Sequence, residues 1–167
     1  MAVQQTMSER ETYLETFERE YQITLKVLRA YPPEKADLKP SERSQSAREV
    51  AWALVLYQNE VPRIIQGEPM PTGAMPPAPA TWPEIIAAFE EGHKKVSAKL
   101  AKLTDEQMNG TVRTMTGPKR TEDVRRGNAL WFMMYETIHK RGQLSVYLRM
   151  ASGKVPSIYG PSADEPW

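Results

Sequence analysis

The sequence predicts an all-α protein, a four-helix bundle with long crossover connections. Four long segments carry apolar side chains at helical spacing, three of them begin with a capping box, and no segment has a convincing strand pattern. Amphipathic helices of this kind bury their apolar stripes against one another in a bundle. The length fits one domain covering residues 1–167.

The expected helices are separated by proline-rich or polar connections. We expect them over residues 9–31, 44–66, 81–103 and 122–151. The capping boxes, in which a Ser or Thr and a Glu three residues later satisfy free backbone donors, are Ser8–Glu11, Ser46–Glu49 and Thr81–Glu84. Residues 67–80 hold five prolines and form a stiff, extended crossover. Residues 104–121 form a polar connection with turn signals at Asn109-Gly110 and Gly117-Pro118.

The fourth helix and the segment after it carry most of the unusual features. This helix is apolar almost all round, so it is expected to be buried on several sides or to supply a dimer interface. Residues 155–167 contain three prolines and cannot extend it. Ile158 and Tyr159 are expected to dock this tail across the bundle. Arg141 lies among apolar residues and needs a partner if it is buried; Asp123, Glu60 or an acidic residue of a second subunit could serve, and an anion-binding role is the alternative.

Composition excludes several classes of function. With 22 basic and 21 acidic residues the net charge is +1, so nothing calls for nucleic acid or an anionic membrane as a partner. The absence of cysteine excludes disulfides, zinc–thiolate sites and cysteine nucleophiles. Residues 4–10 lack the apolar core of a secretory signal and no apolar run is long enough to span a membrane, so a cytoplasmic location is expected. A glycine-rich phosphate loop, a dinucleotide fingerprint and a Ser/His/Asp pattern are also missing.

Candidate pocket residues occupy one face of the second helix and one face of the fourth, because bundles build sites from facing helices. They are Ala53, Glu60, Glu136, His139, Lys140, Gln143 and Tyr147. A divalent metal would have to use Glu60, Glu136 and His139, with His93 as a further donor. We expect instead that Glu136 and Lys140 form an i,i+4 ion pair and that His93 is a core histidine with one satisfied hydrogen bond; the metal set is the alternative.

Two stretches of the sequence resemble a known family. Residues 138–149 followed by 155–165 are similar to the C-terminal signature of the DinB (damage-inducible) family, and residues 47–54 resemble its second-helix motif. The expected helix lengths fit as well, so the resemblance covers nearly the whole chain. It implies a four-helix bundle with a crossover, often dimeric.

The resemblance also implies a chemistry that this chain departs from. Many family members bind a divalent metal through three histidines, one on the second helix and two, one helical turn apart, on the last. Those positions fall at Ala53, Glu136 and Lys140, and none is a histidine. His139 matches a family histidine that is usually not a ligand. Related proteins are thiol-dependent transferases or isomerases and metal-dependent hydrolases.

Two functions are therefore expected as alternatives. In the first, the metal site has degenerated, no cofactor is held, and the protein is a small-ligand-binding or stress-related dimeric module. In the second, it is a metal-dependent hydrolase or thiol-dependent transferase that holds zinc or nickel through the shifted set Glu60, Glu136 and His139. The expected partners are a second copy of the chain and a small molecule.

Overall fold

Four long helices make up the body of the computed structural model, which describes residues 7–71 and 73–167. They are α1 (Glu9–Ala30), α2 (Ala47–Gln66), α3 (Trp82–Leu100) and α5 (Arg126–Met150). A short 3₁₀ turn, η1 (Pro33–Lys35), follows α1, and a short helix, α4 (Asp105–Asn109), follows α3. The predicted four-helix bundle is confirmed. Residues 4–6 of the N-terminal stretch expected to lack a secretory signal lie outside the described residues.

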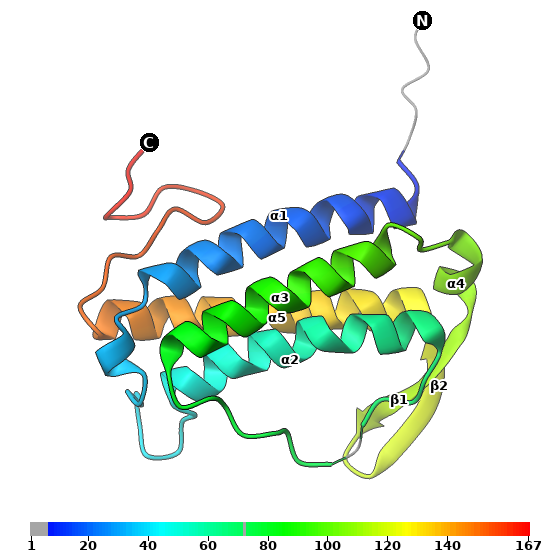
Figure 1. Cartoon of the computed structure of the whole chain (residues 1–167), viewed down its shortest axis with the longest axis horizontal. Helices are drawn as coiled ribbons and strands as arrows, with labels where there is room; N and C mark the ends of the chain where they lie inside the picture. The colour runs from blue at the N-terminus through cyan, green and yellow to red at the C-terminus, as the bar shows by residue number, and fades with distance from the viewer. Residues whose placement is uncertain (1–6, 72) are drawn as a thin grey trace, which may run out of the picture.

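The helices are arranged so that α1 and α2 lie diagonally across the bundle, as do α3 and α5. Helix α2 packs against α3 and α5, and α1 packs against the same two helices. Helices α2 and α3 run in the same direction, so the crossover between them returns along the length of the bundle (Figure 1). This return path leaves an extended segment beside α2 instead of a fifth helix, and it later forms one wall of the candidate site.

Both hydrogen bonds of the expected capping boxes form at Ser8 and Ser46. The serine hydroxyl accepts from the backbone N–H of the glutamate three residues later, and the glutamate carboxylate accepts from the backbone N–H of the serine. At the start of α3 the Thr81 backbone N–H donates to the Glu84 carboxylate over 2.9 Å. Each cap satisfies backbone donors that the first helical turn leaves free. These local patterns explain why the helix starts could be read from the sequence to within a few residues.

The expectation that no strand is present was wrong. Residues 111–125 form an antiparallel hairpin of β1 (Thr111–Gly117) and β2 (Arg120–Arg125), in which Thr111 pairs with Arg125 and Thr114 with Glu122. Only Val112 of this hairpin is buried, so the alternation of apolar and polar residues that reveals a half-buried strand is absent. The turn signal at Gly117-Pro118 was in the right place, and Lys119 takes the left-handed conformation, φ 60°, in the turn.

The hairpin is attached to the bundle by two arginines at the start of α5, which begins at residue 126 and not near 122. The Arg126 guanidinium donates to the carbonyl oxygens of Ile65 and Thr111, each over 3.0 Å. Arg125 forms an ion pair with Glu9 of α1. The hairpin is therefore held against the ends of α1 and α2, and its Arg113 carbonyl accepts from the Met70 backbone N–H at the start of the crossover, over 3.2 Å.

A polar layer divides the apolar interior into two clusters. One cluster surrounds Leu28, Leu54 and Leu144 at one end of the bundle, and the other surrounds Phe17, Ile64 and Leu130 at the other end. The buried polar side chains between them come from three helices and are Glu20, Thr24, Gln58 and Arg141. A cavity of about 20 Å³ in this layer has room for about one water molecule.

Arg141 is at the centre of that layer and only 1% exposed. Its guanidinium donates to the Glu20 carboxylate over 2.6 Å and to the Thr24 hydroxyl over 3.3 Å. The partner is therefore Glu20 of α1, and the expectation of Asp123, Glu60 or a second subunit was wrong. Burial by itself would raise the pKa of Glu20, but hydrogen bonds from Tyr159 and Arg141 outweigh it and lower that pKa.

The C-terminal segment joins this network from outside. The Tyr159 hydroxyl lies 2.5 Å from the Arg141 guanidinium and donates to Glu20 over 2.6 Å. Ile158 packs against the apolar cluster around Leu28. At the chain's end Glu165 pairs with Lys26 of α1 over 2.6 Å. The tail therefore contacts α1 and α5 together (Figure 1).

None of the helices in the described part of the chain combines the length and apolarity needed to cross a lipid bilayer.

We predict that Arg141→Met lowers the free energy of unfolding by about 3–5 kcal/mol, because it leaves the Glu20 carboxylate buried without its cation. The double substitution Arg141→Met, Glu20→Met should recover most of this loss, since both charges are then removed. Urea unfolding measures both. Arg149→Met is the matched control on the same helix: Arg149 pairs with Asp164 but is 49% exposed, so its loss should cost under ~1 kcal/mol. An Arg141→Met variant as stable as Arg149→Met would show that the buried pair is not what holds α1 to α5.

Candidate functional site

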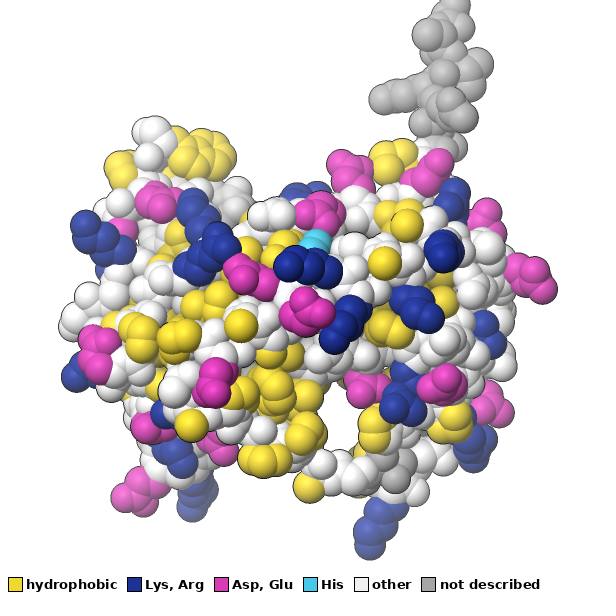
Figure 2. All heavy atoms as spheres, viewed as in Figure 1, with side chains coloured by type: hydrophobic (Ala, Val, Ile, Leu, Met, Phe, Trp, Pro, Cys, Tyr) yellow, Lys and Arg dark blue, Asp and Glu magenta, His cyan; other side chains and the backbone are white. Residues whose placement is uncertain are grey.

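The candidate site is a cleft between α2 and the crossover that follows it. Figure 2 shows the opening between the crossover and the helices, with hydrophobic side chains along its edge. Two adjoining cavities make up the cleft, and both are lined by Leu56, Met75 and Pro76. The larger has a volume of about 540 Å³ and the smaller about 220 Å³. The crossover is thus the outer wall of a concave site whose inner wall is α2.

Two side chains of α2 hold the crossover in place. The Trp52 indole N–H donates to the Pro76 carbonyl over 2.9 Å. The Arg48 guanidinium donates to the carbonyl of Pro79 over 3.2 Å and also to that of Ala80, while pairing with Asp37. Because proline nitrogens carry no hydrogen, the crossover is short of backbone donors for its own carbonyl oxygens. Trp52 and Arg48 supply donors to some of these oxygens.

The larger cavity contains Ala53, the position at which the family resemblance places a metal ligand. Gln45, Glu49 and Trp52 line the same cavity. Lys140 and Tyr147 of α5 do not line it themselves, but both reach Gln45: the Lys140 ammonium donates to its amide oxygen over 2.7 Å, and the Tyr147 hydroxyl donates to its backbone carbonyl over 3.0 Å. Through these hydrogen bonds to Gln45, Lys140 and Tyr147 are linked to the cavity that Ala53 lines.

The expected ion pair between Glu136 and Lys140 was wrong. No ion pair joins these two residues in the described part of the chain, where Lys140 bonds instead to Gln45. The Glu136 carboxylate faces the Tyr57 hydroxyl of α2 closely enough for its negative charge to act on it. Burial, and then the negative charge of Glu136, raise the pKa of Tyr57. Lys140 of α5 therefore bonds to the segment just before α2, in place of a charge pair within α5.

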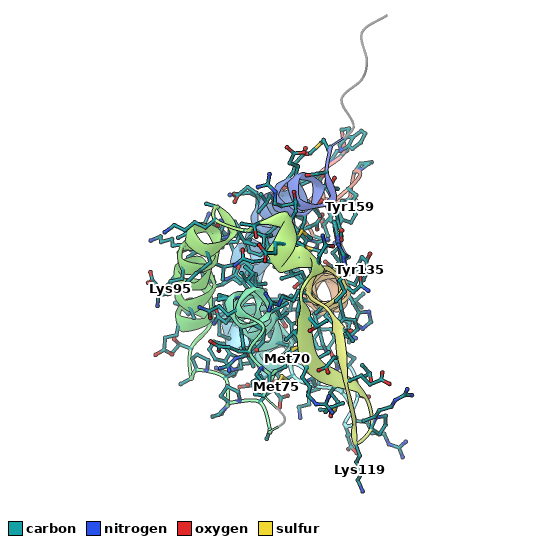
Figure 3. All side chains as sticks on the ribbon, turned by 90° about the vertical axis from the view of Figure 1, so that its right-hand side faces the viewer. Met70, Met75, Lys95, Lys119, Tyr135 and Tyr159 are labelled. Atoms are coloured by element: carbon teal, nitrogen blue, oxygen red, sulfur yellow. The ribbon has the colours of Figure 1, made fainter. Side chains whose placement is uncertain are left out.

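Glu60 lies in the smaller cavity, with Tyr57 and three methionines, Met70, Met75 and Met133. Figure 3 shows Met70 and Met75 close together below α2. The Glu60 Oε2 atom is buried without a hydrogen-bond partner among the described residues, and Arg63 lies 3.5 Å away. Burial raises the pKa of this carboxyl group, and Arg63 opposes the shift only in part.

His139 and Gln143 lie outside the cleft. The side chain of His139 is exposed, and its Nε2 atom is 2.9 Å from the Gln143 amide nitrogen. Within the ranges 7–71 and 73–167 no three side chains of His, Cys, Asp or Glu come together as a group that could hold a metal ion. The shifted set Glu60, Glu136 and His139 therefore does not converge, and these donors do not fit a divalent ion.

His93 occupies a separate place, between α1 and α3. Its ring stacks on Tyr21, with 3.4 Å between ring centroids, and on Phe17 at 5.5 Å. The Nε2 atom lies 3.0 Å from the Glu18 carboxylate and 3.2 Å from the Ser97 hydroxyl, while Nδ1 is buried without a partner in the described chain. Burial lowers the pKa of this histidine, and Glu18 opposes the shift. His93 is therefore a packed but only partly buried residue, with its side chain 12% exposed, so the expected core histidine is matched only in part.

Comparison with known proteins agrees with the fold and the sequence motifs. Residues 16–144 match the model of the DinB superfamily. No curated protein matches the sequence significantly. The chain belongs to the DinB superfamily.

Several solved structures share the fold. A DinB-like protein from Bacillus cereus is 18% identical with a TM-score of 0.72, covering 89% of this chain and 97% of its own. The DinB-like protein YjoA from Bacillus subtilis is 20% identical with a TM-score of 0.65, covering 84% and 92%. YfiT from Bacillus subtilis, described as a probable metal-dependent hydrolase with an unusual four-helix bundle topology, is 16% identical with a TM-score of 0.65, covering 91% and 94%.

Sequence reasoning missed the residues that complete the cleft. These are Gln45, Trp52, Leu56, Tyr57 and the crossover methionines Met70 and Met75. Tyr57 lies one helical turn from Ala53 on α2, and Trp52 lies one turn from Leu56, so their presence near the site could have been read from the helix pattern. Met70 and Met75 could not, because an extended crossover has no periodicity that fixes which side chains turn inward.

We predict that His93 makes stability fall as the pH drops below 7. The folded state lowers the pKa of His93 below its ordinary value of 6.5, so the unfolded chain binds more protons near that pH. The contribution is therefore present above pH 6.5 and is lost as the pH falls through the lower folded value. His93→Phe keeps the stacked ring and should flatten the dependence of the urea midpoint between pH 7 and 5. The control is His139→Gln, which removes the other, exposed histidine and should leave the dependence as in the parent protein; equal slopes in the parent and His93→Phe would contradict the assignment.

Proposed function

We propose that this protein is a DinB-superfamily member that has lost the family's metal site and uses the cleft between α2 and the crossover to bind a small organic molecule. The observation that carries the proposal is the position of Ala53. It lies at a family ligand position, lines the cleft, and has no side-chain atom that can bind a metal.

The surroundings of Ala53 support the same conclusion. The aligned position Lys140 carries an ammonium group, which would repel a cation and which donates to Gln45 over 2.7 Å. Glu136 keeps oxygen atoms that could bind a metal, but they face the Tyr57 hydroxyl. A concave site with mostly apolar walls and a few polar groups is the usual form of a small-molecule site. The smaller cavity has that form, and the larger cavity adds polar and charged groups to it.

The alternative function is a metal-dependent hydrolase or a thiol-dependent transferase. The likeness to YfiT, described as a probable metal-dependent hydrolase, is the observation that favours it. At 16% identity that likeness extends to the fold, whereas the donors needed for a metal do not converge among the described residues. We therefore place the ligand-binding function first.

We predict that protein purified without an affinity tag contains no stoichiometric zinc or nickel by elemental analysis. A variant with Ala53→His, Glu136→His and Lys140→His should gain about one divalent ion per chain, because it restores imidazole donors at the three family positions. Near one equivalent of metal in the parent protein, lost on Glu136→Ala, would contradict the proposal and favour the hydrolase or transferase.

We predict that small organic probes perturb the methionine methyl signals of the cleft. Met75 lines both cavities, so its ¹³C-methyl resonance should shift on titration with a mixed set of neutral, cationic and anionic aromatic fragments. Met150, exposed at the end of α5, is the internal control and should not shift. Leu56→Trp should abolish the effect by filling the space that the two cavities share. No movement of Met75 with any fragment at millimolar concentration would overturn the ligand-binding function.

We further propose that α5 pairs with α5 of a second copy. Its outer face carries exposed apolar side chains: Phe132 is 54% exposed, Tyr135 61%, Val146 59% and Met150 50%. Tyr135 lies on the outer side of α5 in Figure 3. This stripe is nearly symmetric about Arg141, so an antiparallel twofold pairing would set Phe132 against Met150 and Tyr135 against Val146. A surface complementary to itself is what an isologous dimer requires.

We predict a dimer by size-exclusion chromatography with light scattering at about ten micromolar, and a monomer for Tyr135→Glu, Val146→Glu, since each copy would then bury unpaired charges at the interface. Lys95→Glu, which changes the charge of an exposed position on α3, should remain dimeric. A monomeric parent protein at that concentration would refute the pairing.

A further inference from the structure

Glu60 is placed to hold a positive charge inside the smaller cavity. Its side chain is 23% exposed, yet its Oε2 atom is fully buried and lacks a hydrogen bond in the described chain. The neighbouring Arg63 does not satisfy it: the Nε atom is 3.5 Å away without hydrogen-bond geometry. Arg63 is also 43% exposed and is shared with Glu68 at 3.6 Å. A carboxylate with so weak a partner is costly to bury. A cation in the cavity would relieve that cost by pairing with the accessible Oε1 atom, because Oε2 itself exposes almost no surface to a ligand.

The other walls of the cavity suit the body of a small organic cation. Tyr57 contributes an aromatic ring, and the negative charge of Glu136 acts on its hydroxyl. A cation near the ring would be attracted by its negatively charged face and by the second carboxylate beyond it. Met70, Met75 and Met133 contribute flexible thioethers, which adapt to apolar groups of varied shape.

Size and charge exclude other kinds of occupant. The cavity volume of about 220 Å³ is below the ~300 Å³ at which sites for drug-sized ligands begin. An anion would face Glu60 with no basic side chain lining the cavity. A divalent metal would need a third donor near Glu60 and Glu136, and the described residues supply none.

We propose that the smaller cavity binds a small organic ammonium ion, with the charged group at Glu60 and a short apolar body between Tyr57 and the methionines. This inference rests on the proposed ligand-binding function and names the class of ligand. The ammonium group donates to the accessible Oε1 atom of the Glu60 carboxylate, while the crossover encloses the apolar part.

Benzylamine is the probe, because it combines a primary ammonium with one aromatic ring, and benzyl alcohol is its neutral counterpart of nearly the same shape. Binding is followed through the methionine methyl resonances, with Met75 as the reporter of the cleft and Met150 as the control. We expect benzylamine to shift Met75 and to bind roughly tenfold more tightly than benzyl alcohol, the effect of one charge-assisted hydrogen bond. Glu60→Gln should remove this preference.

The matched control is Glu68→Gln. Glu68 also pairs with Arg63 but does not line the cavity, so its substitution should keep the preference for benzylamine. Urea midpoints of both variants establish that they are folded. Equal affinity for the two probes at Met75, unchanged in Glu60→Gln, would overturn the ammonium inference and leave the ligand-binding cleft standing. If neither probe nor any of the wider fragments shifts Met75, both the ammonium inference and the ligand-binding function are overturned. If benzylamine shifts Met150 but not Met75, binding lies outside the cavity and the ammonium inference is overturned.

Discussion

The buried ion pair between Arg141 and Glu20 is the interaction on which the arrangement of the bundle depends. It joins α5 to α1 in the middle of an otherwise apolar interior, and both side chains are at most 2% exposed. A charge in that position is tolerated only with a closely matched partner, because burial removes its hydration. Thr24 and Tyr159 supply the further hydrogen bonds. The pair therefore fixes the lengthwise register of α1 on α5.

The same polar layer sets the distance between the other two helices. Gln58 of α2 donates to the Phe89 carbonyl of α3 over 2.9 Å. Beside it lies Gly92, where an added Cβ would come within 2.7 Å of the Gln58 amide nitrogen and 2.5 Å of the Asn59 amide oxygen. Glycine thus allows the close approach of α3 to α2 at this level. The two apolar clusters above and below supply most of the favourable burial, and the polar layer specifies how the helices are aligned.

The cleft follows from topology. Since α2 and α3 run in the same direction, the chain between them must return along the bundle, and a proline-rich sequence keeps that return extended (Figure 1). Trp52 and Arg48 hold it against α2. Residues of the crossover can be substituted without disturbing helix packing. This property suits a superfamily in which one fold carries different sites. In this chain the wall supplies methionines and α2 supplies a carboxylate.

The sequence by itself determined the helices and their caps, because these depend on interactions between residues three or four apart. The apolar stripe that this spacing gives each helix also predicted that the helices form one bundle. The resemblance to the DinB family could also be read from the chain alone, and with it the expectation that Ala53, Glu136 and Lys140 stand where many members have histidines. The sequence pattern did not reveal the hairpin at 111–125, since its strands are mostly exposed and carry no apolar alternation.

Only the tertiary structure decided which charged groups meet. Arg141 is 121 residues from Glu20 along the chain, and no local pattern selects that carboxylate over Asp123 or Glu60. Lys140 was expected to pair with Glu136 one turn away, but Gln45, which precedes α2, lies closer to its ammonium group in the folded chain. Hydrogen bonds between distant segments depend on helix order and direction. Those are fixed by packing of the whole bundle, and for that reason the partners of buried charges could not be derived from the sequence.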